Sequence, residues 1–181
     1  LPSQAAYHFI SGYTAKVAGT EAGVVEPVPS FSSCFGAPFM PRDPSVYANL
    51  LGKQMAEHKA DCWLVNTGWS GGGFEKGQRM SLKYSRAIVD AILDGSLQNA
   101  LTLNDPVFGL EMITECPAAP NEVLQPKLTW RDPDAYDRAA NRLAAMFVEN
   151  FKKFEKNSPA YITAAGPVIS KDQNTRVCET V

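Results

Sequence analysis

The chain has 181 residues, of which 45% are hydrophobic and 20% charged, a balance typical of a globular protein and not of a disordered one. Its formal net charge of −2 excludes an overall basic field that would favour nucleic acid or an anionic membrane. No apolar run approaches the roughly 18–20 residues of a membrane-spanning helix. We therefore expect neither nucleic acid nor a membrane among its partners.

The N-terminal third predicts short strands and a loop. The aromatic and β-branched run at residues 7–10 predicts a buried strand, and residues 13–18 predict a second one. Proline, glycine and serine then fill residues 23–44, where no long regular element is expected. We expect this loop to be ordered by its own aromatic residues, Phe31, Phe35 and Phe39.

Two Asp-Pro pairs are typical of helix starts, with the aspartate as N-cap and the proline at the first helical position. The first pair, Asp43-Pro44, precedes apolar residues at helical spacing and predicts a helix that ends near His58. The second pair, Asp132-Pro133, predicts the longest helix, to about Phe154. Capping and the helix dipole also explain the acidic residues that follow the second pair, so these do not indicate a metal site.

The middle of the chain alternates between the two types of element. We predict a buried strand at 62–65, a helix at 84–93 closed by Asp94-Gly95, and a strand at 107–113. Residues 117–127 predict a proline-interrupted loop, and the composition turns polar from Ser170. The predicted fold class is mixed α/β.

The cysteines and histidines indicate no special chemistry. The four cysteines form no C-x-x-C pair and the chain has two histidines, which argues against structural zinc and a disulfide scaffold. Reduced, mostly buried thiols in a cytoplasmic protein explain the pattern better. His8, inside an apolar run, is best read as a core residue, and no catalytic triad is expected. The cysteines are Cys34, Cys62, Cys116 and Cys178.

The glycine-rich stretch from Thr67 to Gly77 fits neither phosphate-binding pattern. The Walker A loop requires G-K-[ST], whereas Lys76 precedes Gly77 here, and the G-x-G-x-x-G pattern fails at Lys76. Two alternatives remain open. The stretch is either a mobile connector or the lead-in to a platform that binds a purine nucleoside, in which an arginine stacks on the base. The platform residues would be Arg79, Met80 and Ser85.

Two further cations, Lys16 and Arg86, lie beside a predicted strand end and near a predicted helix start. Such a cation can bind an anion, although a surface ion pair is the commoner role.

Several long blocks resemble the C-terminal part of ATP-dependent phosphoenolpyruvate carboxykinase. They are YHFISGYTAKVAGTEAGV (7–24), PSFSSCFGAPFMPRDPSVYANLL (29–51), LVNTGW (64–69) and RMSLKYSRAIVDAILDGSL (79–97), and the similarity extends in order to about Pro167. The resemblance implies a lyase that converts oxaloacetate and ATP to phosphoenolpyruvate, CO₂ and ADP in gluconeogenesis, with Mg²⁺ and Mn²⁺. It also implies that residues 1–169 belong to the C-terminal nucleotide-binding domain, followed by a polar tail at 170–181.

The resemblance assigns a narrow set of residues to this chain. Arg79 and Met80 match the arginine and aliphatic residue that sandwich the adenine of ATP or ADP, and Ser85 matches a hydroxyl residue, often threonine, that holds the nucleoside. The segment between Trp69 and Arg79 is longer than in the bacterial members compared. The FSSCFGAPF block resembles a segment near the active cleft, with Phe39 at its wall.

The family's Walker A loop, metal-binding segment, substrate arginines and Mn²⁺ ligands lie upstream of this part, so no catalytic or metal-binding residue is assigned here. We expect the 181 residues to be inactive alone. The first residue, Leu1, favours a chain that begins inside a longer one, with a processed terminus as the competing explanation. The alternative function is a non-catalytic nucleotide-binding or regulatory module that retains part of the fold, and the oligomeric state is not predicted.

Overall fold

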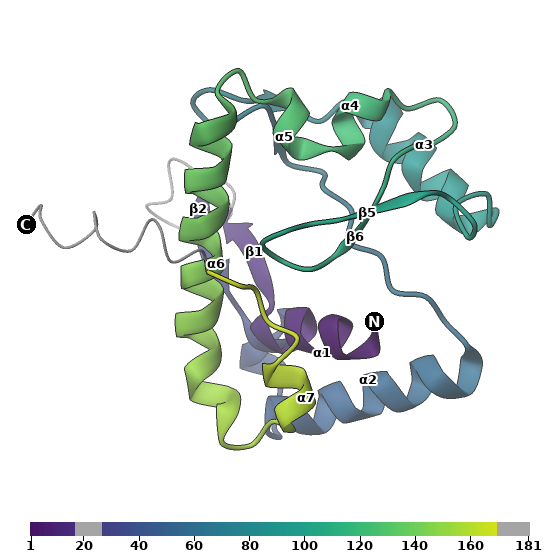
Figure 1. The fold of residues 1–181 in the computed structure, drawn as a ribbon. Coiled ribbons are helices and arrows are strands. Elements are labelled where there is room, and N and C mark those ends of the chain that lie inside the picture. Colours follow the sequence, from purple (N-terminus) through teal and green to yellow (C-terminus); the bar gives the residue numbers. More distant parts are fainter. Residues whose placement is uncertain (17–26, 170–181) are drawn as a thin grey trace, which may run out of the picture. The chain divides into compact units, whose positions relative to one another are not determined.

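A computed structural model describes residues 1–16 and 27–169 of the chain (Figure 1). These residues belong to two compact units: residues 1–62 with 144–167, and residues 63–143 with 168 onwards. The long helix α6 (Pro133–Glu155) contributes its first part to unit 2 and its second part to unit 1. Both units combine helices with two-stranded antiparallel sheets, which confirms the mixed α/β class.

Unit 1 begins with helix α1 (Pro2–Ser11), so the predicted strand at 7–10 is wrong. The buried residues Ala6, Tyr7 and Ile10 follow helical spacing, and the apolar run is too short for its period to distinguish helix from strand. Gly12 ends the helix in the left-handed conformation, at φ 58° and ψ 42°, and its N–H donates to the carbonyl of His8.

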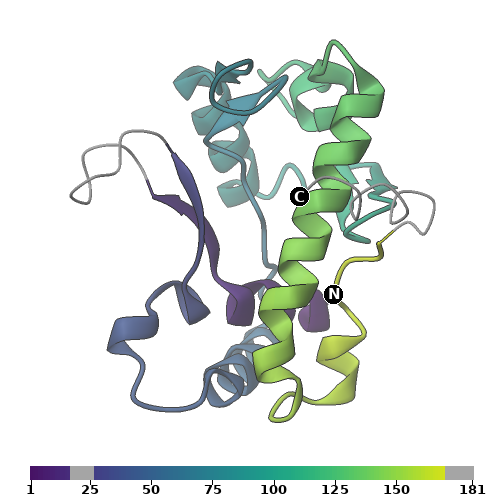
Figure 2. The ribbon, with the colours of Figure 1, turned by 90° about the vertical axis from the view of Figure 1, so that its left-hand side faces the viewer.

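A hairpin follows α1, in which β1 (Tyr13–Lys16) pairs antiparallel with β2 (Val28–Phe31) (Figure 2). The strand predicted at 13–18 is confirmed over residues 13–16, and its last two residues lie outside the described part. The loop predicted at 23–44 holds β2 and two 3₁₀ turns, η1 (Ser33–Phe35) and η2 (Ala37–Phe39), from residue 27 onwards. Its elements are short, as expected.

The loop's three phenylalanines differ in their packing. Phe31 lies 5.2 Å from the ring of Phe147 and Phe35 lies 6.5 Å from the ring of Phe9, measured between centroids. Phe39 is 85% exposed. The predicted aromatic packing is therefore found at Phe31 and Phe35, near the start of the loop, whereas Phe39 near its end is exposed.

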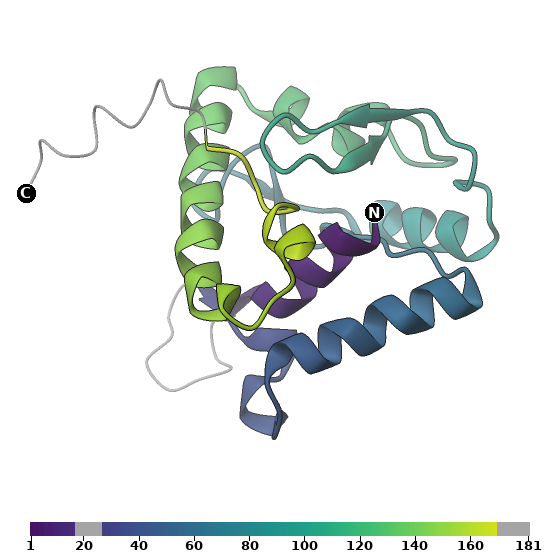
Figure 3. The same cartoon turned by 60° about the horizontal axis from the view of Figure 1, so that its bottom comes forward.

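Helix α2 (Pro44–His58) confirms the first Asp-Pro prediction at both ends. The side chain of Asp43 accepts a hydrogen bond of 2.9 Å from the N–H of Ser45 and another of 2.7 Å from the side-chain amide of Asn157. Helix α1 contacts both α2 and the single-turn helix α7 (Ala160–Thr163) (Figure 3).

Unit 1 is centred on an aromatic core made of Tyr7, Phe147 and Phe151. The ring of Tyr7 stacks on Phe151 with centroids 4.1 Å apart and planes 15° apart, and Phe151 is 1% exposed. Burial, with a contribution from the charge of Glu155, raises the pKa of Tyr7 to about 12. His8 lies 5.3 Å from Phe147, and burial lowers the pKa of His8, which fits its predicted core role.

Unit 2 has a separate core of Ile88, Ala91, Leu97 and Cys116. Helix α3 (Leu82–Leu93) supplies the first two of these and confirms the predicted helix at 84–93. The other elements of this unit are β3 (Trp69–Ser70), β4 (Gln78–Arg79), β5 (Thr102–Asn104), β6 (Glu111–Ile113), α4 (Asn121–Leu124), α5 (Pro126–Thr129) and the first part of α6.

The predicted strand at 62–65 is wrong. Trp63 and Val65 pack against the core of unit 2 while Leu64 between them is exposed, which is the alternation of an extended chain. A strand also requires a hydrogen-bonded neighbour, and along the described ranges these residues pair with none.

Two further predictions in unit 2 need correction. The strand at 107–113 covers only β6, because the side chain of Asp105 accepts hydrogen bonds from the N–H groups of Val107 and Phe108 and holds a turn there. The loop predicted at 117–127 contains the one-turn helix α4, which fits between Pro120 and Pro126, and the start of α5, which has Pro126 as its first residue. Helix α6 confirms the second Asp-Pro prediction, since Asp132 accepts from the N–H groups of Asp134 and Ala135.

Candidate functional site

The glycine-rich stretch forms a tight hairpin, here called the glycine hairpin (residues 68–80). Strands β3 and β4 pair antiparallel, with Trp69 directly opposite Arg79. The N–H of Met80 donates to the carbonyl of Gly68 at 2.8 Å and closes the base of the hairpin. The predicted platform therefore begins at the end of a paired strand.

The turn of the glycine hairpin is anchored to helix α5. The N–H of Gly71 donates to Thr129 Oγ1 at 3.0 Å, and within the turn the N–H of Gly77 donates to the carbonyl of Gly73 at 2.7 Å. Gly71 has φ 78°, and a Cβ added there would lie 2.9 Å from the carbonyl oxygen of Thr129. This glycine thus permits a positive φ and a close backbone approach, which the reading as a mobile connector does not explain.

Arg79 is exposed and lies over an aromatic ring. Its guanidinium carbon is 4.8 Å from the centroid of Trp69, within the range of a cation–π contact. The ring of Phe74, from the turn, meets Trp69 edge-on, with centroids 5.6 Å apart and planes 84° apart. Trp69 thus contacts the guanidinium from one side, and Arg79 as a whole remains exposed to solvent.

The other two platform residues lie further along the same segment. Met80 is half-buried and follows β4 directly, whereas Ser85 is 8% exposed and shares a face of α3 with Ile88. The segment from 79 to 85 therefore presents a cation at an exposed position and a hydroxyl at a buried one. That these three residues bind a nucleoside remains a prediction.

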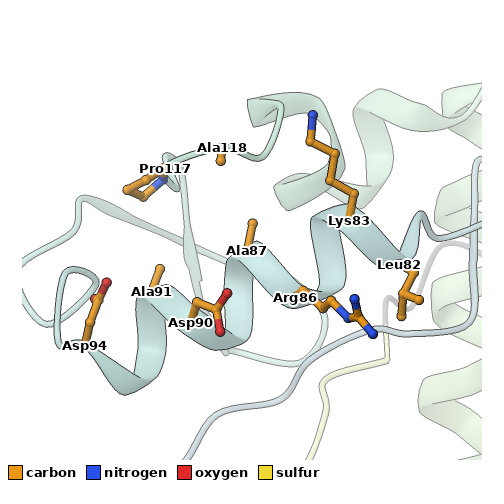
Figure 4. Close-up of a pocket in the computed structure, with 9 residues that line it drawn as sticks. All are labelled: Leu82, Lys83, Arg86, Ala87, Asp90, Ala91, Asp94, Pro117 and Ala118. Carbon is orange, nitrogen blue, oxygen red and sulfur yellow. The ribbon is translucent and has the colours of Figure 1, made fainter.

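A shallow hollow of about 510 Å³ lies along α3 (Figure 4). Lys83 and Arg86 line it toward the start of the helix, and Asp90 and Asp94 toward its end. The two cations and the two carboxylates offset one another in formal charge. Anion binding by Arg86 or by Lys16, which ends β1, remains a prediction.

The remaining candidates have structural roles. Asp132 caps α6, and backbone hydrogen bonds, led by the one from Ala135, hold the pKa of its carboxyl below the usual value. Asp137 forms an ion pair of 2.7 Å with Lys127. Over residues 1–16 and 27–169, no group of three or more His, Cys, Asp or Glu side chains gathers as a metal site would require.

The thiols of Cys34, Cys62 and Cys116 are free, as predicted. Cys34 and Cys116 are buried, and burial raises the pKa of each thiol, whereas Cys62 is exposed. Cys178 and the polar tail lie outside the described residues. No helix in the described part of the chain combines the length and apolar character needed to cross a membrane.

Comparison with known proteins agrees with the resemblance. Residues 1–122 match the family described as Phosphoenolpyruvate carboxykinase. The chain belongs to this family. Curated relatives named "Phosphoenolpyruvate carboxykinase (ATP)" include that of Rhodopseudomonas palustris (strain TIE-1), 55% identical over 166 residues, and that of Brucella suis biovar 1 (strain 1330), 56% identical over 168 residues.

These matches cover 92% and 93% of the chain but 31% of each relative. The chain thus spans about a third of the length of the curated carboxykinases that it matches.

Sequence reasoning about the site missed Trp69 and Thr129. Trp69 contacts Arg79 only because two two-residue strands bring positions 69 and 79 opposite each other. Thr129 reaches Gly71 across 58 positions of sequence. The glycines on both sides of Trp69 were the available sign of a hairpin, but nothing in the sequence marked its partner on α5.

Proposed function

We propose that the chain supplies the adenine and ribose side of the ATP site in an ATP-dependent phosphoenolpyruvate carboxykinase. The observation that carries this proposal is the exposed arginine of the glycine hairpin, in a chain 55% identical to carboxykinases that use ATP. The reaction of the whole protein would break the bond to a carboxylate of oxaloacetate, release CO₂, and transfer the γ-phosphoryl group of ATP to the resulting enolate oxygen.

Each platform residue offers a distinct interaction with a nucleoside. The planar guanidinium of Arg79 can stack on a purine face, which gains cation–π and dispersion energy. The thioether of Met80 adds a polarizable apolar surface next to it. The hydroxyl of Ser85 can donate to and accept from ribose or a base edge.

The phosphate end of the nucleotide would be bound elsewhere. The turn of the glycine hairpin lacks the lysine and hydroxyl arrangement of a phosphate-binding loop. The Mg²⁺ and Mn²⁺ that the family implies do not fit the described residues, which hold no ligand cluster, so we assign no step of the reaction to a metal here. The assignment of residues 1–169 to a nucleotide-binding domain with a polar tail, and the cytoplasmic location, belong to the same proposal.

The test uses the full-length gene product. We expect it to form phosphoenolpyruvate from oxaloacetate only when ATP is present. We expect Arg79→Ala to weaken ATP binding by about 1–2 kcal/mol, the scale of a stacked cation, in isothermal calorimetry. Arg131→Ala, at another exposed arginine of unit 2, is the matched control and should leave the affinity unchanged.

Each outcome has a distinct meaning. Unchanged ATP affinity in Arg79→Ala would reject the base platform. ATP binding without turnover in the wild-type gene product would instead support the alternative, a non-catalytic nucleotide-binding module.

A further inference from the structure

We propose that Trp69 is a positioning residue, which holds the guanidinium of Arg79 flat so that its free face is ready to stack on a purine. The inference rests on the proposed function, because it requires that Arg79 binds the base. It adds a second layer to the site, so that indole, guanidinium and purine would lie one on another.

The first support is the register of the hairpin. Trp69 and Arg79 are directly opposite each other in an antiparallel pair, so their side chains project from the same face. The guanidinium carbon lies 4.8 Å from the ring centroid, within the range of a cation–π contact. The backbone register therefore places the two side chains next to each other on one face of the hairpin.

The second support is that the indole is itself held in place. Phe74 packs edge-on against it, and the hydrogen bond from Gly71 to Thr129 fixes the strand end that follows Trp69. An exposed arginine has several rotatable bonds, and ordering it on binding costs free energy. An indole that orders Arg79 beforehand lowers this cost.

The third support is the chemistry of the guanidinium, which is planar and has two usable faces. Trp69 contacts the guanidinium from one side, and the exposure of Arg79 leaves surface for a ligand. The contribution should depend on the base of the ligand and not on its phosphates. A ligand without a base, such as inorganic tripolyphosphate, should be bound equally well with or without Trp69.

The experiment is a double-mutant cycle on the full-length gene product, with ATP and tripolyphosphate titrated in parallel by calorimetry. We expect Trp69→Leu to weaken ATP binding about 3- to 10-fold, as expected for loss of a cation–π contact. In the Arg79→Ala background the same substitution should have no further effect. Trp69→Phe keeps an aromatic face and should lose less affinity than Trp69→Leu.

A second cation–π pair provides the matched control. Lys153 Nζ lies 4.9 Å from the ring centroid of Phe154 on α6, and Phe154→Leu should leave ATP affinity unchanged. If Trp69→Leu fails to fold, Trp69→Phe in the wild-type and Arg79→Ala backgrounds supplies the same cycle with a smaller expected coupling.

The results separate this inference from the proposed function. If Arg79→Ala weakens ATP binding and either Trp69→Leu has no effect or the two losses add, the positioning role is wrong and the base platform stands. Equal weakening of ATP and tripolyphosphate by Trp69→Leu would mean general damage and would also overturn it. If Arg79→Ala has no effect, both proposals fail together.

Discussion

The aromatic core of unit 1 and the glycine hairpin of unit 2 use aromatic rings in opposite ways. In the core, Tyr7 and Phe151 stack on each other and are almost completely buried, so their faces contribute to folding. In the hairpin, the ring of Trp69 contacts the guanidinium of Arg79, and Phe74 is 49% exposed. An aromatic surface that folding leaves open, next to a charge, is the kind of surface that a ligand can use.

This comparison predicts that substitutions in unit 1 change stability, whereas substitutions at the hairpin change binding.

The largest effect is expected from Gly12→Ala. Gly12 has φ 58°, and an added Cβ would lie 1.7 Å from the carbonyl oxygen of Ser32, so the backbone at the start of the β1–β2 hairpin must move. We expect a loss of more than about 4 kcal/mol in the free energy of unfolding, or no folded protein, in urea denaturation. Gly52→Ala on α2 is the control, since nothing lies within 4 Å of an added Cβ, and it should be neutral or slightly stabilising.

Phe151→Ala and Phe74→Ala compare the two regions directly. Removing the buried ring of Phe151 should cost about 3 kcal/mol of stability, because it leaves a cavity next to Tyr7. Removing the half-exposed ring of Phe74 should cost less than about 1 kcal/mol, because little area is lost from the core. If thermal unfolding shows the same loss of stability for the two variants, the two regions do not differ in how their rings contribute to folding.

The N-cap of α2 should make stability depend on pH. Hydrogen bonds from Ser45, and then from Asn157, lower the pKa of Asp43 below its usual value near 3.8. A carboxyl with a lowered folded-state pKa stabilises the fold above the unfolded pKa, and this contribution is lost as the pH falls through the folded pKa.

We expect Asp43→Ala to cost about 1 kcal/mol at neutral pH, the usual value of an N-cap. Asp43→Asn keeps a capping oxygen and should show a smaller loss of stability than the wild type between neutral pH and pH 3. Stability is measured by urea denaturation at each pH. If the asparagine variant loses as much stability on acidification as the wild type, Asp43 is not the group responsible.

The smallest effect is expected at the ion pair between Lys127 and Asp137. The two side chains are 49% and 40% exposed, so solvent screens their attraction. Lys127→Met should cost no more than about 0.5 kcal/mol, and less at high salt. A larger loss of stability that persists in 1 M NaCl would contradict a screened surface ion pair. It would indicate that Lys127 helps to hold α5, and with it the glycine hairpin that is hydrogen-bonded to Thr129, in place.

The elements that the sequence predicted well are those with local signals. Asp43 and Asp132 each cap a helix through hydrogen bonds to N–H groups two or three residues ahead, so the signal and its structure lie within a few positions. The apolar spacing in α3 and α6 is long enough to define a helical period. The family resemblance was likewise carried by long continuous blocks.

The strand predictions failed where a partner had to be known. The run at 7–10 was too short to define a period, and Gly12 completed a helix instead. The run at 62–65 is extended but unpaired within the described ranges. The prediction failed there because the pattern of one segment does not show whether another strand lies beside it.

For the site, residue types were enough to identify side chains that can bind a nucleoside and to argue against a phosphate-binding loop at the glycines. The folded structure was needed to see that these glycines form a tight hairpin, that Trp69 contacts Arg79, and that Thr129 accepts a hydrogen bond from Gly71. The chemistry of a side chain follows from the type of residue alone. Contacts between residues 10 and 58 positions apart depend on how the backbone folds between them.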